Sequence, residues 1–169
     1  MTYFKRAQLE LLQNKTDEAI NDLATAVQLK PDFAAAYFLA SQVFAARGQF
    51  QEALVPAVSA VRLVQNDPLA WYNVGSIAYA AGAYADAATA LEKSLSIEPQ
   101  YANAMYVLGL TYYQLGRADD SYQIFTQLKV IDPNQAIIQQ ILANLEAGKA
   151  PLEQNTATQG DTNTSTGRN

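Results

Sequence analysis

The chain has 169 residues, half of them hydrophobic and 16% charged, so it is long enough to bury a sizeable core. It contains neither Cys nor His, which excludes disulfides, thiol chemistry, imidazole bases and the usual zinc ligands. The net charge is −5 and Lys and Arg form no cluster, which argues against a nucleic acid as the partner.

Two uncharged stretches, 68–85 and 99–116, are long enough to be weighed as membrane spans. Both are interrupted by Gly and amide residues and are richer in Ala and Tyr than in large aliphatic residues. We therefore expect no membrane span in this chain. No signal-peptide core is visible, so the cytoplasm is the default location, and a soluble domain of a membrane protein is the alternative.

When the sequence is shifted by 34 residues it aligns with itself without gaps, and one column of this alignment contains Phe4, Phe38, Tyr72 and Tyr106. Another column contains residues that tolerate a left-handed backbone at the end of a helix: Asn14, Gly48, Gly82 and Gly116. A third contains small residues that let two helices approach closely: Ala19, Ala53, Ala87 and Ser121. A fourth contains Pro31, Gln65, Pro99 and Pro133, in which the prolines end one unit before the next begins. In the second unit the stop is displaced to Asp67 and Pro68. These columns predict helix–turn–helix units.

Apolar residues between the turns have helical spacing, which predicts four helix pairs in chain order. Their expected bounds are 3–13 with 17–29, 33–46 with 50–64, 68–81 with 84–97, and 101–115 with 118–131. The corresponding repeats are about 1–33, 34–67, 68–101 and 102–135. Pro56 lies inside an expected helix, where it either kinks the helix or is tolerated on a solvent-facing side.

A different pattern follows the fourth pair. Ile138, Ile141, Leu142 and Leu145 share one helical face and predict a capping helix at 136–148 that covers the last repeat. Residues 149–169 are rich in Thr, Asn, Gln and Gly and predict a disordered tail. We therefore expect one domain at 1–148.

These columns resemble the tetratricopeptide repeat family, whose pattern places Trp, Leu-Gly, Tyr, Ala, Phe and Pro at fixed offsets. The third repeat is the most similar, with Trp71, Gly75, Tyr84, Ala87 and Pro99. The fourth repeat carries Leu108, Gly109, Tyr112, Phe125 and Pro133 at the corresponding positions. The resemblance covers residues 3–147 and implies an all-α, right-handed α-solenoid of four 34-residue repeats plus a C-terminal capping helix.

The first helices of the second, third and fourth repeats contain no charged residue. In the family these helices line a concave groove, and the resemblance places the following residues there: Phe4, Phe38, Gln42, Tyr72, Ser76, Tyr79, Asn103, Tyr106, Leu110, Tyr113 and Gln114. An aromatic, amide-bearing and uncharged groove suits a protein or peptide partner. The alternative for these aromatic residues is that they pack between neighbouring helices.

Family members that clamp acidic C-terminal peptides use Lys, Asn and Arg at defined groove positions. Here those positions hold Phe38, Gln42, Asn103 and Val107, and only Asn73 agrees, so we expect no carboxylate-clamp ligand. We find no nucleophile–base pair and no phosphate-binding loop, and we expect no catalytic residue, metal or cofactor. The leading hypothesis is a non-catalytic protein–protein interaction module. The alternative is a structural scaffold or spacer domain of a larger protein, including a membrane-anchored one.

Overall fold

The structure is a computed structural model that describes residues 2–152. Within this range it consists of nine α-helices and no β-strand: α1 (Thr2–Leu12), α2 (Thr16–Leu29), α3 (Ala34–Ala46), α4 (Phe50–Leu63), α5 (Pro68–Ala80), α6 (Tyr84–Ile97), α7 (Ala102–Gln114), α8 (Ala118–Ile131) and α9 (Ala136–Glu146). The expected helix bounds differ from these by at most two residues, and the all-α prediction is confirmed. No helix between residues 2 and 152 is long and apolar enough to cross a membrane.

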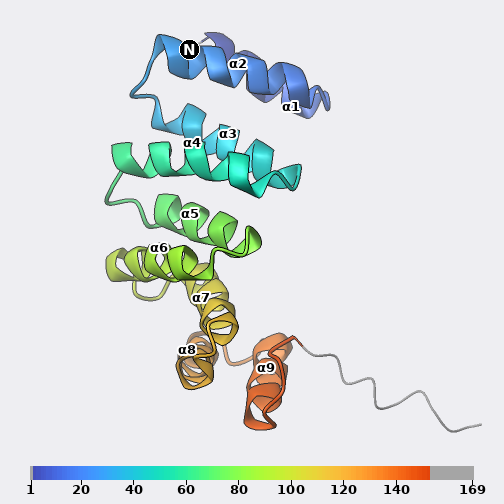
Figure 1. Cartoon of the computed structure of the whole chain (residues 1–169), viewed down its shortest axis with the longest axis vertical. Helices are drawn as coiled ribbons and strands as arrows, with labels where there is room; N and C mark the ends of the chain where they lie inside the picture. Colours follow the sequence, from blue (N-terminus) through green and yellow to red (C-terminus); the bar gives the residue numbers. More distant parts are fainter. Residues whose placement is uncertain (1, 153–169) are drawn as a thin grey trace, which may run out of the picture.

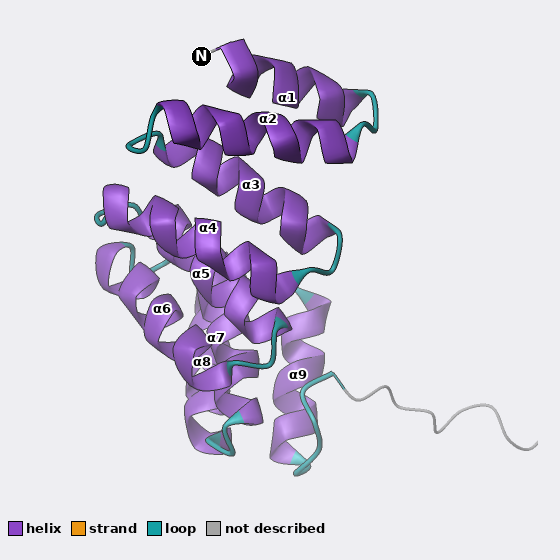
Figure 2. Ribbon diagram, turned by 45° about the horizontal axis from the view of Figure 1, so that its top comes forward, coloured by secondary structure: helices purple, strands orange, loops and turns teal. Residues whose placement is uncertain are grey.

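The helices stack along one long axis, with α1 and α2 at one end and α9 at the other (Figure 1). Each odd-numbered helix up to α7 folds back on the even-numbered helix that follows it, and each pair contacts the next (Figure 2). The even-numbered helices α2, α4 and α6 lie in front of α1, α3 and α5 in Figure 1, so the stack has two layers. This arrangement is a helical-repeat solenoid.

The same turn closes every helix pair. Asn14, Gly48, Gly82 and Gly116 all have positive φ, between 58° and 78°, as their column predicts. In the fourth pair the Arg117 N–H donates to the Tyr112 carbonyl at 2.9 Å, which satisfies a carbonyl at the end of α7. The left-handed backbone conformation at this repeat position therefore reverses the direction of the chain in all four helix pairs.

Small residues hold the two helices of a pair close together. The side chains of Ala19, Ala53, Ala87 and Ser121 are fully buried. The Ser121 hydroxyl donates to the Gly109 carbonyl of the facing helix at 2.7 Å. A Cβ atom at Gly109 would lie 2.6 Å from the Phe125 ring, so only glycine fits there without a shift. These contacts explain the small-residue column.

Helix α9 covers the end of the stack. Its Ile138, Ile141 and Leu142 are buried against Met105 of α7 and Phe125 of α8. Together they enlarge the hydrophobic core where a further repeat would otherwise be needed. The face of α9 predicted from sequence is therefore the face that packs.

The described part of the chain continues for four residues, 149–152, beyond the predicted end of the cap at residue 148. Gly148 has φ 68°, and the Lys149 N–H donates to the Asn144 carbonyl at 2.8 Å. Ala150, Pro151 and Leu152, which were predicted to belong to the tail, lie against α5 and α7, and Pro151 is buried. The rest of the predicted tail, 153–169, lies outside the described residues. Apolar Pro151 and Leu152 differ from the polar composition on which the tail prediction was based.

Candidate functional site

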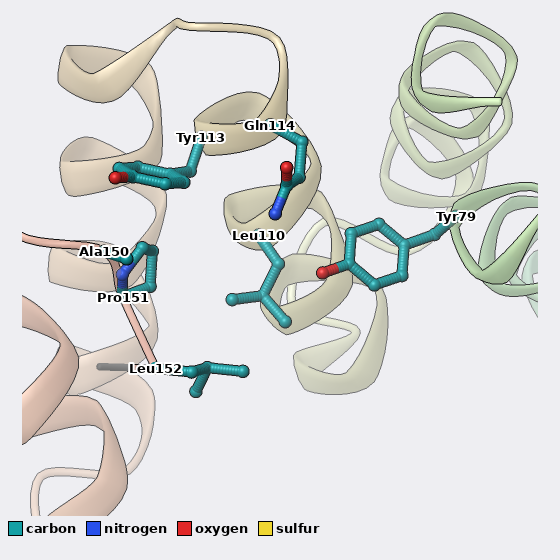
Figure 3. A pocket seen from close by; sticks show the side chains of 7 residues that line it. All are labelled: Tyr79, Leu110, Tyr113, Gln114, Ala150, Pro151 and Leu152. Carbon is teal, nitrogen blue, oxygen red and sulfur yellow. The ribbon is translucent and has the colours of Figure 1, made fainter. Parts of the chain in front are cut away.

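Four of the predicted groove residues surround one cavity of about 290 Å³, which we call the α5–α7 cavity. They are Tyr79 of α5 and Leu110, Tyr113 and Gln114 of α7 (Figure 3). The remaining wall is formed by Ala150, Pro151 and Leu152, which we call the C-terminal segment. The cavity therefore joins helices from two repeats to a piece of chain that follows the cap.

Helical geometry brings these side chains together. Leu110, Tyr113 and Gln114 are spaced three and four residues apart, so they share one face of α7. Tyr79 occupies the repeat position of Tyr113 one repeat earlier, near the end of α5, and α5 contacts α7 directly. Leu110 is buried, Tyr79 and Tyr113 are partly buried, and Gln114 is exposed. The result is an apolar floor with a polar rim.

The electrostatic character of the cavity is neutral. None of the residues that line it is charged. Burial raises the pKa of the Tyr79 phenol, the nearby Tyr84 phenol adds to this, and a hydrogen bond with the Gln114 side chain opposes it. Tyr79 therefore stays protonated near neutral pH and offers a hydroxyl that can donate or accept. Such a site suits apolar side chains and uncharged backbone groups.

Two other predicted groove tyrosines pack against neighbouring rings. The Tyr72 ring lies 5.2 Å from that of Tyr101, edge to face. The Tyr106 ring lies 5.9 Å from that of Phe125, again edge to face, and burial raises the Tyr106 pKa. Both side chains are partly buried. These tyrosines contribute to contacts between helices, as the alternative interpretation anticipated, and keep part of their surface exposed.

The structure does not bring the remaining predicted residues to the α5–α7 cavity. Gln42 and Asn103 are exposed, whereas Phe38 and Ser76 are partly buried. The Ser76 hydroxyl donates to the Asn73 carbonyl of its own helix at 3.1 Å. The predicted groove residues are thus distributed over α1, α3, α5 and α7, and only four of them, near the C-terminal end of the stack, line the cavity. We call the surface of α3, α5 and α7 that carries these residues the first-helix face.

Asn73, the one residue that agrees with a carboxylate clamp, has another contact. It is buried, and its side-chain nitrogen donates to the Ser41 hydroxyl at 2.7 Å. Ser41 in turn donates to the Phe38 carbonyl at 2.7 Å. These hydrogen bonds join α5 to α3, so the amide nitrogen of Asn73 is used in a contact between two repeats.

Sequence reasoning missed the C-terminal segment as part of this site. The Pro151 carbonyl accepts a hydrogen bond from Asn144 Nδ2 at 3.0 Å, and Asn144 is buried in α9. Two signals could have indicated it. Ala150, Pro151 and Leu152 form an apolar run in a polar stretch, and Asn144 falls in the repeat column of Leu110.

A second cavity of about 250 Å³ lies between α2, α3 and α4. Its walls are mainly apolar and include Ile20, Val27, Phe44, Val55 and Pro56. Helix α4 continues through Pro56, so this proline does not end the helix, and its ring lines the cavity. This cavity was not predicted from the sequence, because the predicted groove lay on the first-helix face alone.

Three solved structures illustrate the similarity in fold. MamA residues 41 to the end from Desulfovibrio magneticus RS-1 is 21% identical, with a TM-score of 0.80, over 87% of this chain and 83% of that one. YrrB, described as a TPR protein with an unusual peptide-binding site, is 20% identical, with a TM-score of 0.76, over 89% and 78%. The first TPR of Spaghetti (RPAP3), bound to the HSP90 peptide SRMEEVD, is 14% identical, with a TM-score of 0.65, over 68% and 91%.

None of the curated proteins matches the chain. Two family models do match it, both described as tetratricopeptide repeat, over residues 4–68 and 78–145. Together they span most of the helical stack, and the structural similarities agree with them. The chain therefore belongs to the tetratricopeptide repeat family, and its repeats form a protein–protein interaction module.

Proposed function

We propose that the chain binds an uncharged, partly apolar segment of a partner protein along the first-helix face and catalyses no reaction. The observation that carries this proposal is the neutral α5–α7 cavity, where Tyr79, Leu110, Tyr113 and Gln114 offer an apolar floor and hydrogen-bonding side chains. Tyrosine provides a large contact area at a small cost in side-chain entropy, which favours recognition.

The charge distribution supports a particular ligand chemistry. Helices α3, α5 and α7 contain no charged residue, whereas α2, α4, α6 and α8 all carry acidic residues in their first turns. A charged side chain placed against the first-helix face would lose hydration without gaining an ion pair. The HSP90 peptide SRMEEVD bound by the RPAP3 repeat is rich in acidic residues. We therefore propose that this chain selects against such peptides.

A scaffold role is the second candidate, and the cavity between α2, α3 and α4 favours it. That cavity is lined by the second helices α2 and α4 together with α3, and one of its residues, Val55, is 71% exposed. A chain with two separate apolar cavities could hold two partners at once, which a spacer or assembly scaffold requires. This role needs binding at both cavities.

Selection of displayed random peptides against the full chain tests the proposal. We expect selected peptides to bind the wild type and Tyr122→Ala equally, because Tyr122 lies on α8, away from the first-helix face. Tyr113→Ala should weaken the same peptides by about 1–3 kcal/mol if Tyr113 is an anchor. Peptides that lose affinity for Tyr122→Ala but not for Tyr113→Ala would place binding on the outer layer and contradict the proposal. A second set of selected peptides, sensitive to Val55→Asp but not to Tyr113→Ala, would show binding at both cavities and favour the scaffold role.

A further inference from the structure

The chain leaves the cap helix in a way that differs from the earlier repeats. Helix α9 begins one repeat length after α7 but is shorter, with 11 residues where α7 has 13. Gly148 follows it with a φ of 68°, in the same left-handed region as the other turn glycines. After the earlier glycines a second helix begins, whereas Ala150, Pro151 and Leu152 instead line the α5–α7 cavity. Figure 3 shows Ala150 and Pro151 beside Tyr113, with the Leu152 side chain below Leu110.

Asn144 anchors this segment. It is only 2% exposed, and its Nδ2 donates to the Pro151 carbonyl at 3.0 Å. Its Oδ1 accepts from Gln140 Nε2 at 2.9 Å, so both ends of the amide are engaged. Asn144 occupies the same repeat position as Leu110, Ser76 and Gln42, which were predicted to line the groove. The cap helix therefore uses a predicted groove position to bind a backbone carbonyl of the C-terminal segment.

The chemistry of the segment matches that of the cavity. Ala150, Pro151 and Leu152 are uncharged, and charged residues, Lys149 and Glu153, flank them in the sequence. Pro151 is buried, while Leu152 keeps 52% of its surface exposed next to the remaining cavity volume. Proline restricts the backbone before binding, which lowers the entropy lost when an extended segment is held.

We propose that Ala150–Leu152 is a built-in cover of the α5–α7 cavity, which a partner segment must displace in order to reach Tyr79, Leu110 and Tyr113. The segment is joined to α9 through only Ala147, Gly148 and Lys149, so its effective concentration at the cavity reaches at least the millimolar range typical of short linkers. A free peptide of equal intrinsic affinity therefore cannot compete at micromolar concentration. The displacement step rests on the proposed function, whereas the contact of the segment with the cavity does not.

A spin label on the full chain tests the contact. The chain has no Cys, so Glu153→Cys provides a single labelling site. We expect the label to broaden the amide signals of Tyr79, Leu110 and Tyr113. Adding Leu152→Asp should reduce this broadening, because a carboxylate would be placed against an uncharged cavity. Leu29→Asp is the matched control, since Leu29 is 70% exposed on α2, and it should leave the broadening unchanged. Equal broadening in Leu152→Asp and Leu29→Asp would show that the C-terminal segment does not contact the cavity in the way proposed.

A peptide of residues 148–156 tests the displacement. It is titrated, with NMR detection, into the full-length Leu152→Asp and Leu29→Asp variants without a spin label. We expect it to shift the signals of Tyr79 and Tyr113 in Leu152→Asp at a concentration at least tenfold lower than in Leu29→Asp. Equal shifts in the two variants, or shifts in neither, would overturn the proposal. Displayed peptides that bind the wild type and Leu152→Asp equally would refute displacement and leave the proposed function standing. If neither the wild type nor Leu152→Asp selects a displayed peptide that depends on Tyr113, while the spin-label result is intact, the proposed function is refuted and the contact of the segment with the cavity stands.

Discussion

Gly75 of α5 lies directly against Leu91 of α6, since a Cβ atom at position 75 would come within 2.5 Å of the Leu91 Cγ atom. Leu91 is fully buried, so it has no space into which to move. The same relationship recurs one repeat later between Gly109 and Phe125. In the third and fourth repeats, therefore, a glycine of the first helix receives a large side chain of the second helix.

Substituting Gly75→Ala should lower the free energy of unfolding. Overpacking a core costs about 1–3 kcal/mol, and the better helix propensity of alanine returns about 1 kcal/mol of this. Urea unfolding of both proteins measures the difference. In a Leu91→Ala background, itself less stable by about 2–5 kcal/mol, the clash is gone, so Gly75→Ala should be neutral or stabilising. The same loss in both backgrounds would show that the contact with Leu91 is not the cause.

Adjacent isoleucines in α9 should behave differently. Ile138 is fully buried against the last repeat, whereas Ile137 is 47% exposed. Ile138→Ala should lower the free energy of unfolding by about 2–5 kcal/mol because it leaves a cavity in the core. Ile137→Ala should change it by less than about 1 kcal/mol, since a surface substitution removes little packing. Similar losses from both, measured by thermal unfolding, would contradict the assignment of the capping face.

Stability should depend on the ionisation of Tyr112 at alkaline pH. This side chain is buried, its hydroxyl donates to Glu92 Oε1 at 2.9 Å, and the Arg117 guanidinium lies 4.0 Å from its ring centre. Burial, followed by the hydrogen bond to Glu92, raises the pKa of Tyr112 to about 12. Because the folded-state pKa exceeds the ordinary value near 10, this contribution is complete below about pH 10 and is lost as pH rises towards 12.

The measurement is the melting temperature at about pH 9 and about pH 11.5, on either side of the ordinary tyrosine pKa. We expect a smaller decrease for Tyr112→Phe than for the wild type, because phenylalanine does not ionise. At about pH 9 the variant should be less stable by about 1 kcal/mol, since it lacks the hydrogen bond to Glu92. Identical decreases in the melting temperature of the two proteins would show that ionisation of Tyr112 does not cause the loss of stability at high pH.

Binding at the first-helix face should depend weakly on salt. Screening acts between charges, and the helices α3, α5 and α7 contribute none. The affinity of a selected peptide should therefore change by less than about threefold between about 0.05 and 0.5 M salt. Fluorescence titration at the two concentrations measures this. A decrease of about tenfold would show that the charged outer helices contribute to binding.

Turn residues and the helical spacing of apolar residues predicted the nine helices between residues 2 and 152, with bounds correct to within two residues. They could do so because these features depend on local preferences. Asn14 and Gly82 take the left-handed conformation that ends a helix, and Pro68 begins one after the Asp67 cap, whose carboxylate accepts from the Leu69 N–H at 2.9 Å. The buried face of α9 followed from helical periodicity for the same reason.

Only the tertiary structure decided which of the predicted groove residues meet. Repeat position indicates the face of a helix but not the side chain opposite it, so Tyr106 packs on Phe125 and Asn73 hydrogen-bonds to Ser41, whereas Tyr79 and Tyr113 share a cavity. The position of Pro151 depends on a hydrogen bond to Asn144, in a segment that no repeat position describes. Local backbone preference and period determine the elements of this protein, and contacts between side chains of different repeats determine its site.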